Sequence, residues 1–265
     1  MRVRTNDIET AWYEIGRGDP IIFIHGLGDD HRAWRRVVPE LALDHRLILY
    51  DFRGHGQTSI GQPDATLEQL AGDLVALMDA LVLDTATLAG FSLGGTIAMR
   101  AAIDHPERVR TLALVATSSR VNAAAEQWYR DRGRMAAEHD PTLRQLLERD
   151  AEDVYRNRPE EIKGGLLIRR QSTANPAGHA NACLAMASLR EHPLDPELVR
   201  IAAPTMIVAG EQDQHCPPRA GEIIAASIAG SRLEVLPDTG HPIPVERPVE
   251  LARLIAEASR PEATF

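Results

Sequence analysis

The chain has 265 residues, 44% of them hydrophobic and 25% charged, which suits a globular protein of one α/β domain or two small ones. A net charge of −9 and an isoelectric point near 5.6 argue against a nucleic-acid partner, because such partners are bound by basic surfaces. No apolar run approaches the ~18 residues of a membrane helix, no signal peptide is recognisable, and two cysteines are too few for a disulfide framework or a zinc cluster. We therefore expect a cytoplasmic protein without membrane contact, while its oligomeric state, a homo-oligomer included, stays open.

Short apolar segments alternate with helical patterns along the chain. The expected strands are 21–25, 46–50, 87–91, 111–115, 205–209 and 232–236, preceded by an antiparallel edge strand at 9–14. Helices are expected at 66–81, from Ser92 to about 105, and at 246–259. Continuous apolar strands separated by helices indicate a mostly parallel sheet with helices on both faces, which is an α/β fold.

Residues 119–196 interrupt this alternation, because they contain no strand signal. They read as short helices, including 123–138, 142–149 and 177–189, inserted into a core domain made of residues 1–118 and 197–265. The insertion is rich in arginine, with Arg130, Arg132, Arg134, Arg144, Arg149, Arg156, Arg158, Arg169 and Arg170. Two interpretations stay open for these arginines: a solvated surface, or a lid in which one or two of them hold an anionic substrate.

The pentapeptide Gly90-Phe91-Ser92-Leu93-Gly94 matches the pattern G-x-S-x-G and lies between an expected strand and an expected helix. On such a tight turn glycine is needed at both flanking positions, and the serine hydroxyl is pushed out above the sheet. The backbone N–H of Leu93, at the start of the helix, is then placed to bind a developing oxyanion. The pattern predicts Ser92 as the nucleophile of a hydrolase that forms an acyl-enzyme.

A serine nucleophile needs a histidine base and a carboxylate that orients it. His241 is the preferred base because it follows the strand 232–236 in a loop at the carboxyl end of the sheet. His25 and His55 are rivals, but each lies beside glycine in a turn and is expected to make structural hydrogen bonds. Asp213 is the preferred carboxylate over Glu211, since it lies farther past the end of the strand 205–209 and can reach His241.

The chain resembles the α/β-hydrolase fold superfamily over nearly its whole length. The matching segments are His25-Gly26-Leu27-Gly28, Asp51-Phe52-Arg53-Gly54-His55-Gly56, the acid loop 210–213 after Pro204-Thr205, and Gly240-His241 with Glu246 and Pro248. The resemblance implies that Leu27 offers the second oxyanion N–H, that the 51–56 loop is chiefly structural, and that the order Ser92, Asp213, His241 is that of the family triad. Within the superfamily, the segments 25–34, 91–95 and 203–218 are similar to 3-oxoadipate enol-lactonases and small carboxylesterases.

The expected activity is hydrolysis of a small-molecule carboxylic ester or (enol-)lactone, with no metal or organic cofactor. Dehalogenases and epoxide hydrolases of this fold carry aspartate at the position of Ser92, which argues against both. A carbon–carbon bond hydrolase or a cofactor-free haloperoxidase stays open as an alternative, and a non-catalytic ligand receptor as a more remote one. Four aromatic or sulfur-containing side chains could line the pocket or belong to the core: Trp34, Trp128, Tyr129 and Met186. Cys183 and Cys216 are expected to be packing residues.

Overall fold

The computed structural model describes residues 1–260. Its strands are β1 (Arg2–Thr5), β2 (Ile8–Ile15), β3 (Asp19–Ile24), β4 (His45–Tyr50), β5 (Ala86–Phe91), β6 (Val109–Val115), β7 (Thr205–Gly210) and β8 (Arg232–Leu236). Its α-helices are α1 (Val38–Leu41), α2 (Leu67–Ala80), α3 (Leu93–Asp104), α4 (Ala123–Ala137), α5 (Leu143–Val154), α6 (Ile162–Ser172), α7 (Pro176–Ser188), α8 (Pro218–Ser227), α9 (Ile243–Glu246) and α10 (Pro248–Ala258). None of the helices within this range is long and apolar enough to cross a membrane.

The strands form one sheet in the order β1-β2-β4-β3-β5-β6-β7-β8. β2 pairs antiparallel with both β1 and β4, and every pairing from β4 to β8 is parallel. The prediction of an antiparallel strand near residue 9 is confirmed, but its placement at the edge is wrong, because β1 lies outside it. The predicted α/β-hydrolase architecture of a mostly parallel sheet between helices is confirmed.

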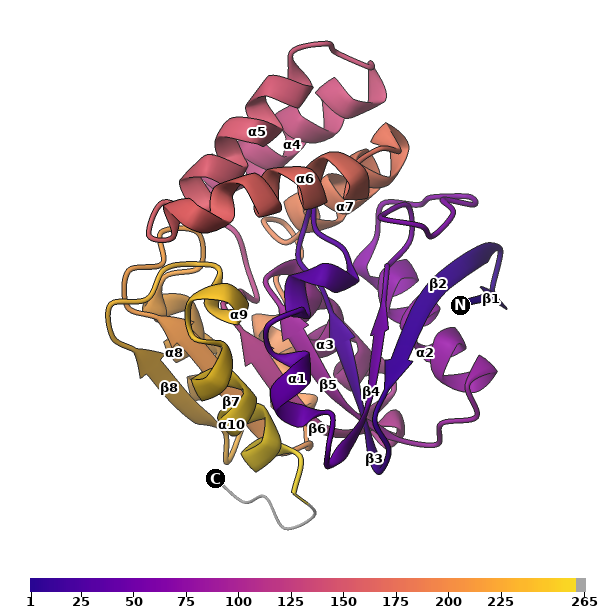
Figure 1. Ribbon diagram of the computed structural model, residues 1–265, viewed down its shortest axis with the longest axis vertical. Coiled ribbons are helices and arrows are strands. Elements are labelled where there is room, and N and C mark those ends of the chain that lie inside the picture. The colour runs from indigo at the N-terminus through magenta and orange to yellow at the C-terminus, as the bar shows by residue number, and fades with distance from the viewer. Residues whose placement is uncertain (261–265) are drawn as a thin grey trace.

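The two faces of the sheet are built from alternate residues of the same strands. In β3, Ile22 and Ile24 pack with α2 and α3, whereas Ile21 and Phe23 pack with α1 and α10 on the opposite face. Figure 1 shows these helices on either side of the sheet. Because both faces are covered, the central strands are apolar at most positions, as the sequence pattern indicated.

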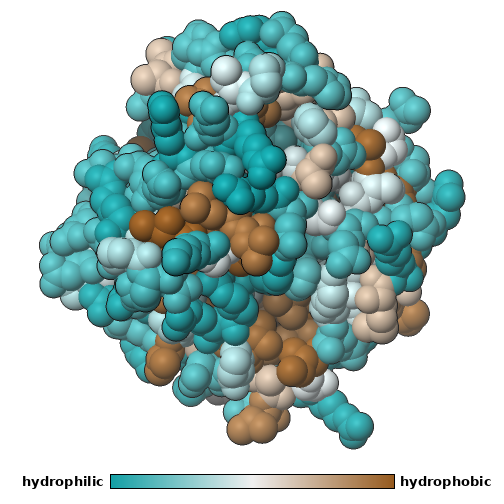
Figure 2. Space-filling model, turned by 45° about the horizontal axis from the view of Figure 1, so that its top comes forward, coloured by the Kyte–Doolittle hydropathy of each residue, from teal (hydrophilic) through white to brown (hydrophobic). Residues whose placement is uncertain are grey.

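Helices α4 to α7 lie between β6 and β7 in the chain and form a separate layer above the carboxyl ends of the parallel strands (Figure 1). We call residues 119–196 the cap. Helices α4 and α7 pack closely, and so do α5 and α6. Most cap arginines form ion pairs near the surface, such as Arg132 with Asp150 and Arg170 with Glu148. The cap surface visible in Figure 2 is accordingly mostly hydrophilic.

A buried arginine holds the loop after β4 against the amino-terminal part of the sheet. Arg53 donates to both carboxylate oxygens of Asp73 in α2, at 2.6 and 2.8 Å, to Asp7 at 2.7 Å, and to the carbonyl of Ile60 at 2.8 Å. The side chains of Arg53 and Asp73 are 1% and 3% exposed. The loop is therefore fixed from several sides, which agrees with a structural role.

We expect Arg53→Met to lower the free energy of unfolding by about 3–5 kcal/mol, because it leaves the buried Asp73 carboxylate without a counter-charge, with the amide of Asn6 still donating to it. Chemical denaturation measures the change. Arg46→Met is the matched control, since Arg46 pairs with Glu14 at the partly exposed end of the sheet and should cost about 1 kcal/mol or less. Equal effects of the two substitutions would contradict a special role for the buried pair.

Candidate active site

Ser92 lies on the turn between β5 and α3. Its backbone angles, φ 54° and ψ −121°, are ones that residues other than glycine rarely adopt. Its N–H donates to the carbonyl of Val115 at 2.9 Å, and its carbonyl accepts from the hydroxyl of Thr117 at 2.7 Å. These bonds to β6 and to the segment that follows it stabilise the strained turn.

Two glycines make this turn sterically feasible. A Cβ at Gly90 would lie 2.3 Å from the carbonyl oxygen of Gly94, and a Cβ at Gly94 would lie 2.2 Å from the carbonyl oxygen of Ile24. Both contacts are far shorter than van der Waals distance and both involve backbone atoms that cannot move aside. The glycines of the G-x-S-x-G pattern are thus required by close packing of β5, α3 and β3.

His241 connects Ser92 to Asp213. Its Nε2 lies 3.2 Å from Ser92 Oγ, and its Nδ1 lies 2.8 Å from Oδ2 of Asp213. His241 follows β8, and its loop is fixed by a hydrogen bond from the N–H of Gly240 to Glu246 at 2.8 Å. The structure therefore brings together the three side chains that the sequence singled out from three separate strand ends.

The Asp213 carboxylate is buried and well supplied with hydrogen bonds. Its second oxygen, Oδ1, accepts from the N–H groups of His215 and Cys216 at 2.8 and 2.9 Å. Burial opposes ionisation, but the charge and hydrogen bond of His241 together with these two donors hold the pKa of Asp213 below its usual value. Glu211 accepts instead from the N–H of Asp238 at 3.0 Å and remains exposed.

The two rival histidines make structural contacts. His25 is fully buried, its Nδ1 lies 2.9 Å from the carbonyl of Gly26, its Nε2 accepts from the N–H of Phe52, and its ring stacks on Phe52 with centroids 4.0 Å apart. His55 is also fully buried, with Nδ1 3.3 Å from the carbonyl of Arg53. Desolvation lowers the pKa of both imidazoles, so both are neutral.

The segment 26–32 follows β3 beside Ser92, and we call it the oxyanion loop after the role that the sequence resemblance implies for Leu27. Leu27 lies in the wall of the same cavity as Ser92, and Leu93 is the first residue of α3, where helix N–H groups have no acceptor within the helix. The cap supports this loop, because the hydroxyl of Ser172 in α6 donates to the carbonyl of Gly28. The carbonyl of Ser172 also accepts from the N–H of Gly56, which lies in the loop after β4.

A cavity of about 430 Å³ lies between the core and the cap and contains Ser92 and His241 in its wall. Trp128 and Tyr129 of α4 line it, whereas Trp34 and Met186 are not in its wall and belong to the hydrophobic core. Cys216 also lines the cavity, and burial raises the pKa of its thiol well above the ordinary value. The wall residues that the sequence did not single out include Asp29, Tyr155 and, among the many cap arginines, Arg169.

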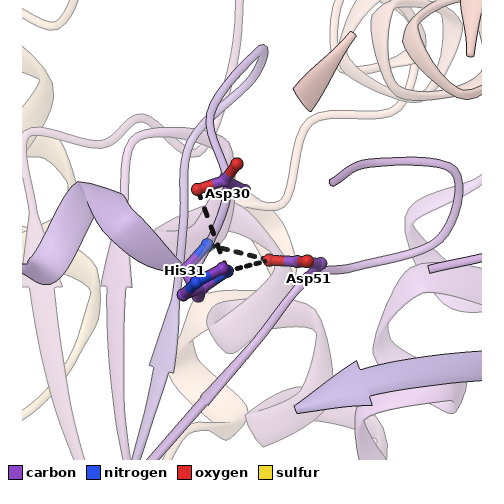
Figure 3. Close-up of side chains that lie close together, drawn as sticks. All are labelled: Asp30, His31 and Asp51. Atoms are coloured by element: carbon purple, nitrogen blue, oxygen red, sulfur yellow. Dashed lines mark hydrogen bonds and ion pairs between the residues drawn. The ribbon is translucent and has the colours of Figure 1, made fainter. Parts of the chain in front are cut away.

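Asp30, His31 and Asp51 form a cluster of potential cation ligands at the base of the oxyanion loop (Figure 3). The cluster is saturated by the protein itself. Asp30 binds Arg32 through both oxygens, Asp51 accepts from the N–H and Nδ1 of His31 and from the N–H of Gln57, and the His31 ring stacks on Tyr13. The cluster therefore ties the oxyanion loop to the loop after β4.

The order of strands, the strained serine turn and the hydrogen-bonded Ser92, His241 and Asp213 define the class. The chain belongs to the alpha/beta hydrolase fold family, whose model matches residues 19–248. It is 30% identical over 243 residues to 3-oxoadipate enol-lactonase 1 of Acinetobacter baylyi, covering 89% of this chain and 86% of that protein. It is 31% identical to 2-hydroxymuconate semialdehyde hydrolase of a Pseudomonas strain, covering 94% and 90% of the two chains. The crystal structure of the enol-lactonase of Burkholderia xenovorans is similar with a TM-score of 0.88 and 25% identity, covering 97% of this chain and 98% of that one.

Proposed function

We propose that this protein is a serine hydrolase that cleaves a small carboxylic ester or (enol-)lactone through an acyl-enzyme. The observation that carries the proposal is the continuous chain from Ser92 Oγ through His241 to Asp213, which opens into the cavity beneath the cap. The similarity to an enol-lactonase supports an ester or lactone carbonyl as the point of attack. We further propose that residues 1–118 and 197–265 supply the chemistry, while the cap selects the substrate.

In this mechanism His241 takes the proton of Ser92 as Oγ attacks the carbonyl carbon. Asp213 keeps Nδ1 of His241 protonated and stabilises the imidazolium that forms. His241 then returns the proton to the leaving alcohol or enol, and the acyl group stays on Ser92. Water, deprotonated by His241, attacks the acyl-enzyme, and the acid leaves as Ser92 regains its proton. No step draws on a metal or an organic cofactor.

The N–H groups of Leu27 and Leu93 are the proposed oxyanion hole. Each belongs to a segment that is rigidly held: Leu93 by the start of α3, and Leu27 by the oxyanion loop that Ser172 anchors. Donors fixed in this way stabilise the tetrahedral intermediate without reorganising, and one such donor is typically worth a factor of 10²–10³ in rate.

Carbon–carbon bond hydrolysis is the second candidate, because a relative named as a semialdehyde hydrolase is as similar to this chain as the enol-lactonase. The same three side chains could serve that reaction. A comparison of rates on simple esters, enol-lactones and vinylogous diketones separates the two: an ester or lactone hydrolase acts on the first two classes and is slow on the third.

A fluorophosphonate probe tests the proposal and excludes a non-catalytic receptor. Attack by Ser92 Oγ forms an O–P bond and expels fluoride, while His241 accepts the proton. We expect one adduct per chain, located by mass spectrometry on the peptide that contains Ser92, together with loss of ester hydrolysis. The unfolded chain is the control and should remain unlabelled. Absence of an adduct on the folded protein would refute the proposed nucleophile.

A further inference from the structure

Two side chains of opposite charge lie in the wall of the catalytic cavity. Asp29, in the oxyanion loop, is 7% exposed, and Arg169, on α6 of the cap, is 8% exposed. The wall also contains apolar and aromatic side chains such as Leu27, Phe91 and Trp128, and two carboxylates of α5 that other arginines bind. The charges of Asp29 and Arg169 are therefore held in the wall of the same cavity as Ser92, which a substrate would enter.

Arg169 differs from the other cap arginines near the cavity in having no hydrogen-bond partner for its buried Nε among residues 1–260. Its guanidinium lies over the oxyanion loop, where a Cβ at Gly28 would be 3.2 Å from Nη1. The acidic residues of α5 in the cavity wall cannot compensate it, because Asp150 is bound by Arg132 at 3.0 Å and Asp153 by Arg156 at 2.6 Å.

Asp29 is the remaining carboxylate of the cavity wall that can offset the positive charge of Arg169. Burial raises the pKa of Asp29, and among the charges that oppose this effect Arg169 is the strongest. The other groups that act on Asp29 are His25, which burial keeps neutral, Asp30, which is bound by Arg32, and His241. The phenol of Tyr155 lies in the same cavity wall, and burial raises its pKa, so it stays uncharged.

We propose that Asp29 neutralises Arg169 and thereby makes the cavity selective for uncharged acyl groups; this inference rests on the proposed ester or lactone hydrolysis. A substrate carboxylate entering the cavity would be attracted by Arg169 but repelled by Asp29, and it would lose its hydration without a net counter-charge. An uncharged acyl group of similar size avoids this cost. Asp29 is thus a specificity-determining residue.

The test compares two activated esters of similar length, p-nitrophenyl hexanoate and p-nitrophenyl hydrogen glutarate, and follows the ratio of their kcat/KM values. The wild-type protein should prefer the neutral ester by at least about tenfold. Asp29→Asn should lower the ratio of neutral to anionic kcat/KM by about tenfold or more, chiefly through KM for the glutarate ester, because Arg169 is then unopposed. Arg169→Met removes the charge that most favours ionisation of Asp29, so it is assayed at alkaline pH, where an ionised and unopposed Asp29 should raise the ratio by a similar factor.

The double variant Asp29→Asn with Arg169→Met should return the ratio to within about threefold of the wild-type value, since the two effects cancel. A purely structural role of either residue would move both esters together and leave the ratio unchanged. Arg170→Met is the matched control, because Arg170 lies next to Arg169 on α6 but pairs with Glu148 outside this cavity.

The inference is overturned if the wild-type protein prefers the glutarate ester, or if the two single substitutions shift the ratio in the same direction or not at all. Should Asp29→Asn fail to fold, the Arg169→Met variant alone tests the proposal. An unchanged ratio of neutral to anionic kcat/KM in that variant contradicts it. A folded wild-type protein that hydrolyses neither ester would refute the proposed function instead, so the two failures are distinguishable.

Discussion

Ser92→Ala is expected to lower kcat for p-nitrophenyl butyrate by about 10⁴- to 10⁶-fold. The substitution removes the nucleophile, so only substrate binding and the oxyanion donors remain to accelerate attack by water. The fold should be retained, because the bonds that hold the turn come from the backbone of Ser92 to Val115 and Thr117. Steady-state rates over a range of substrate concentrations measure the effect, and thermal unfolding checks the fold.

Ser227→Ala is the matched control for this experiment. Ser227 lies in α8 and donates to the carbonyl of Ile223 at 3.0 Å, so its loss removes a hydroxyl of the same chemistry outside the cavity. Its kcat should stay within about twofold of the wild-type value. If Ser92→Ala keeps a tenth or more of the activity, the acyl-enzyme mechanism at this residue is wrong.

Asp213→Asn is expected to lower kcat by about 10⁴-fold with little change in KM. The asparagine amide can present its NH₂ to Nδ1 of His241, which would place the imidazole proton on Nε2 and prevent it from accepting the proton of Ser92. The amide also lacks the charge that stabilises the imidazolium. The substituted loop should still fold, because the N–H groups of His215 and Cys216 can donate to the amide oxygen.

Glu211→Gln supplies the comparison within the same loop. Glu211 contacts the N–H of Asp238 and makes no hydrogen bond to His241 among residues 1–260, so its neutralisation should change kcat by less than about threefold. Similar losses in the two variants, measured with the same ester, would show that the loop is sensitive to any loss of charge and would contradict the assignment of Asp213.

The convergence of Ser92, Asp213 and His241 could be predicted because each of the three follows a recognisable strand. Ser92, Asp213 and His241 come just after β5, β7 and β8, which are neighbours or near neighbours in the sheet and parallel. The carboxyl ends of parallel strands meet at one edge, so residues far apart in the chain converge there. Strand limits were displaced by at most two residues, since buried apolar runs mark them clearly.

The elements that the sequence did not reveal lack such a pattern. β1 is four residues long, contains two arginines and joins the sheet through backbone pairing with β2, so nothing in its side chains marks it as an edge strand. The last predicted helix, 246–259, is divided at Arg247, because Pro248 begins a new helix and cannot donate to the preceding turn.

Helix α6 was also not identified, and it carries Arg169. Gly164 and Gly165 lie inside it, and glycine is a poor helix former. The structure explains Gly165 by close packing, because a Cβ there would lie 2.2 Å from the ring of Tyr155. A contact between two cap helices leaves no periodic signal in the sequence, so Arg169 could not be separated from its neighbours before the structure was available.

The hydrogen bond from Ser172 to Gly28 limits how freely the cap can be exchanged or altered without affecting the core. The cap is inserted between β6 and β7, which makes it a natural unit to exchange with that of another hydrolase. Here the cap also supports the loop that carries Leu27, so a transplanted cap would change the support of one of the two proposed oxyanion donors. The smallest transferable unit is therefore the cap together with residues 26–32. A change of substrate preference made in the cap alone would also lower kcat.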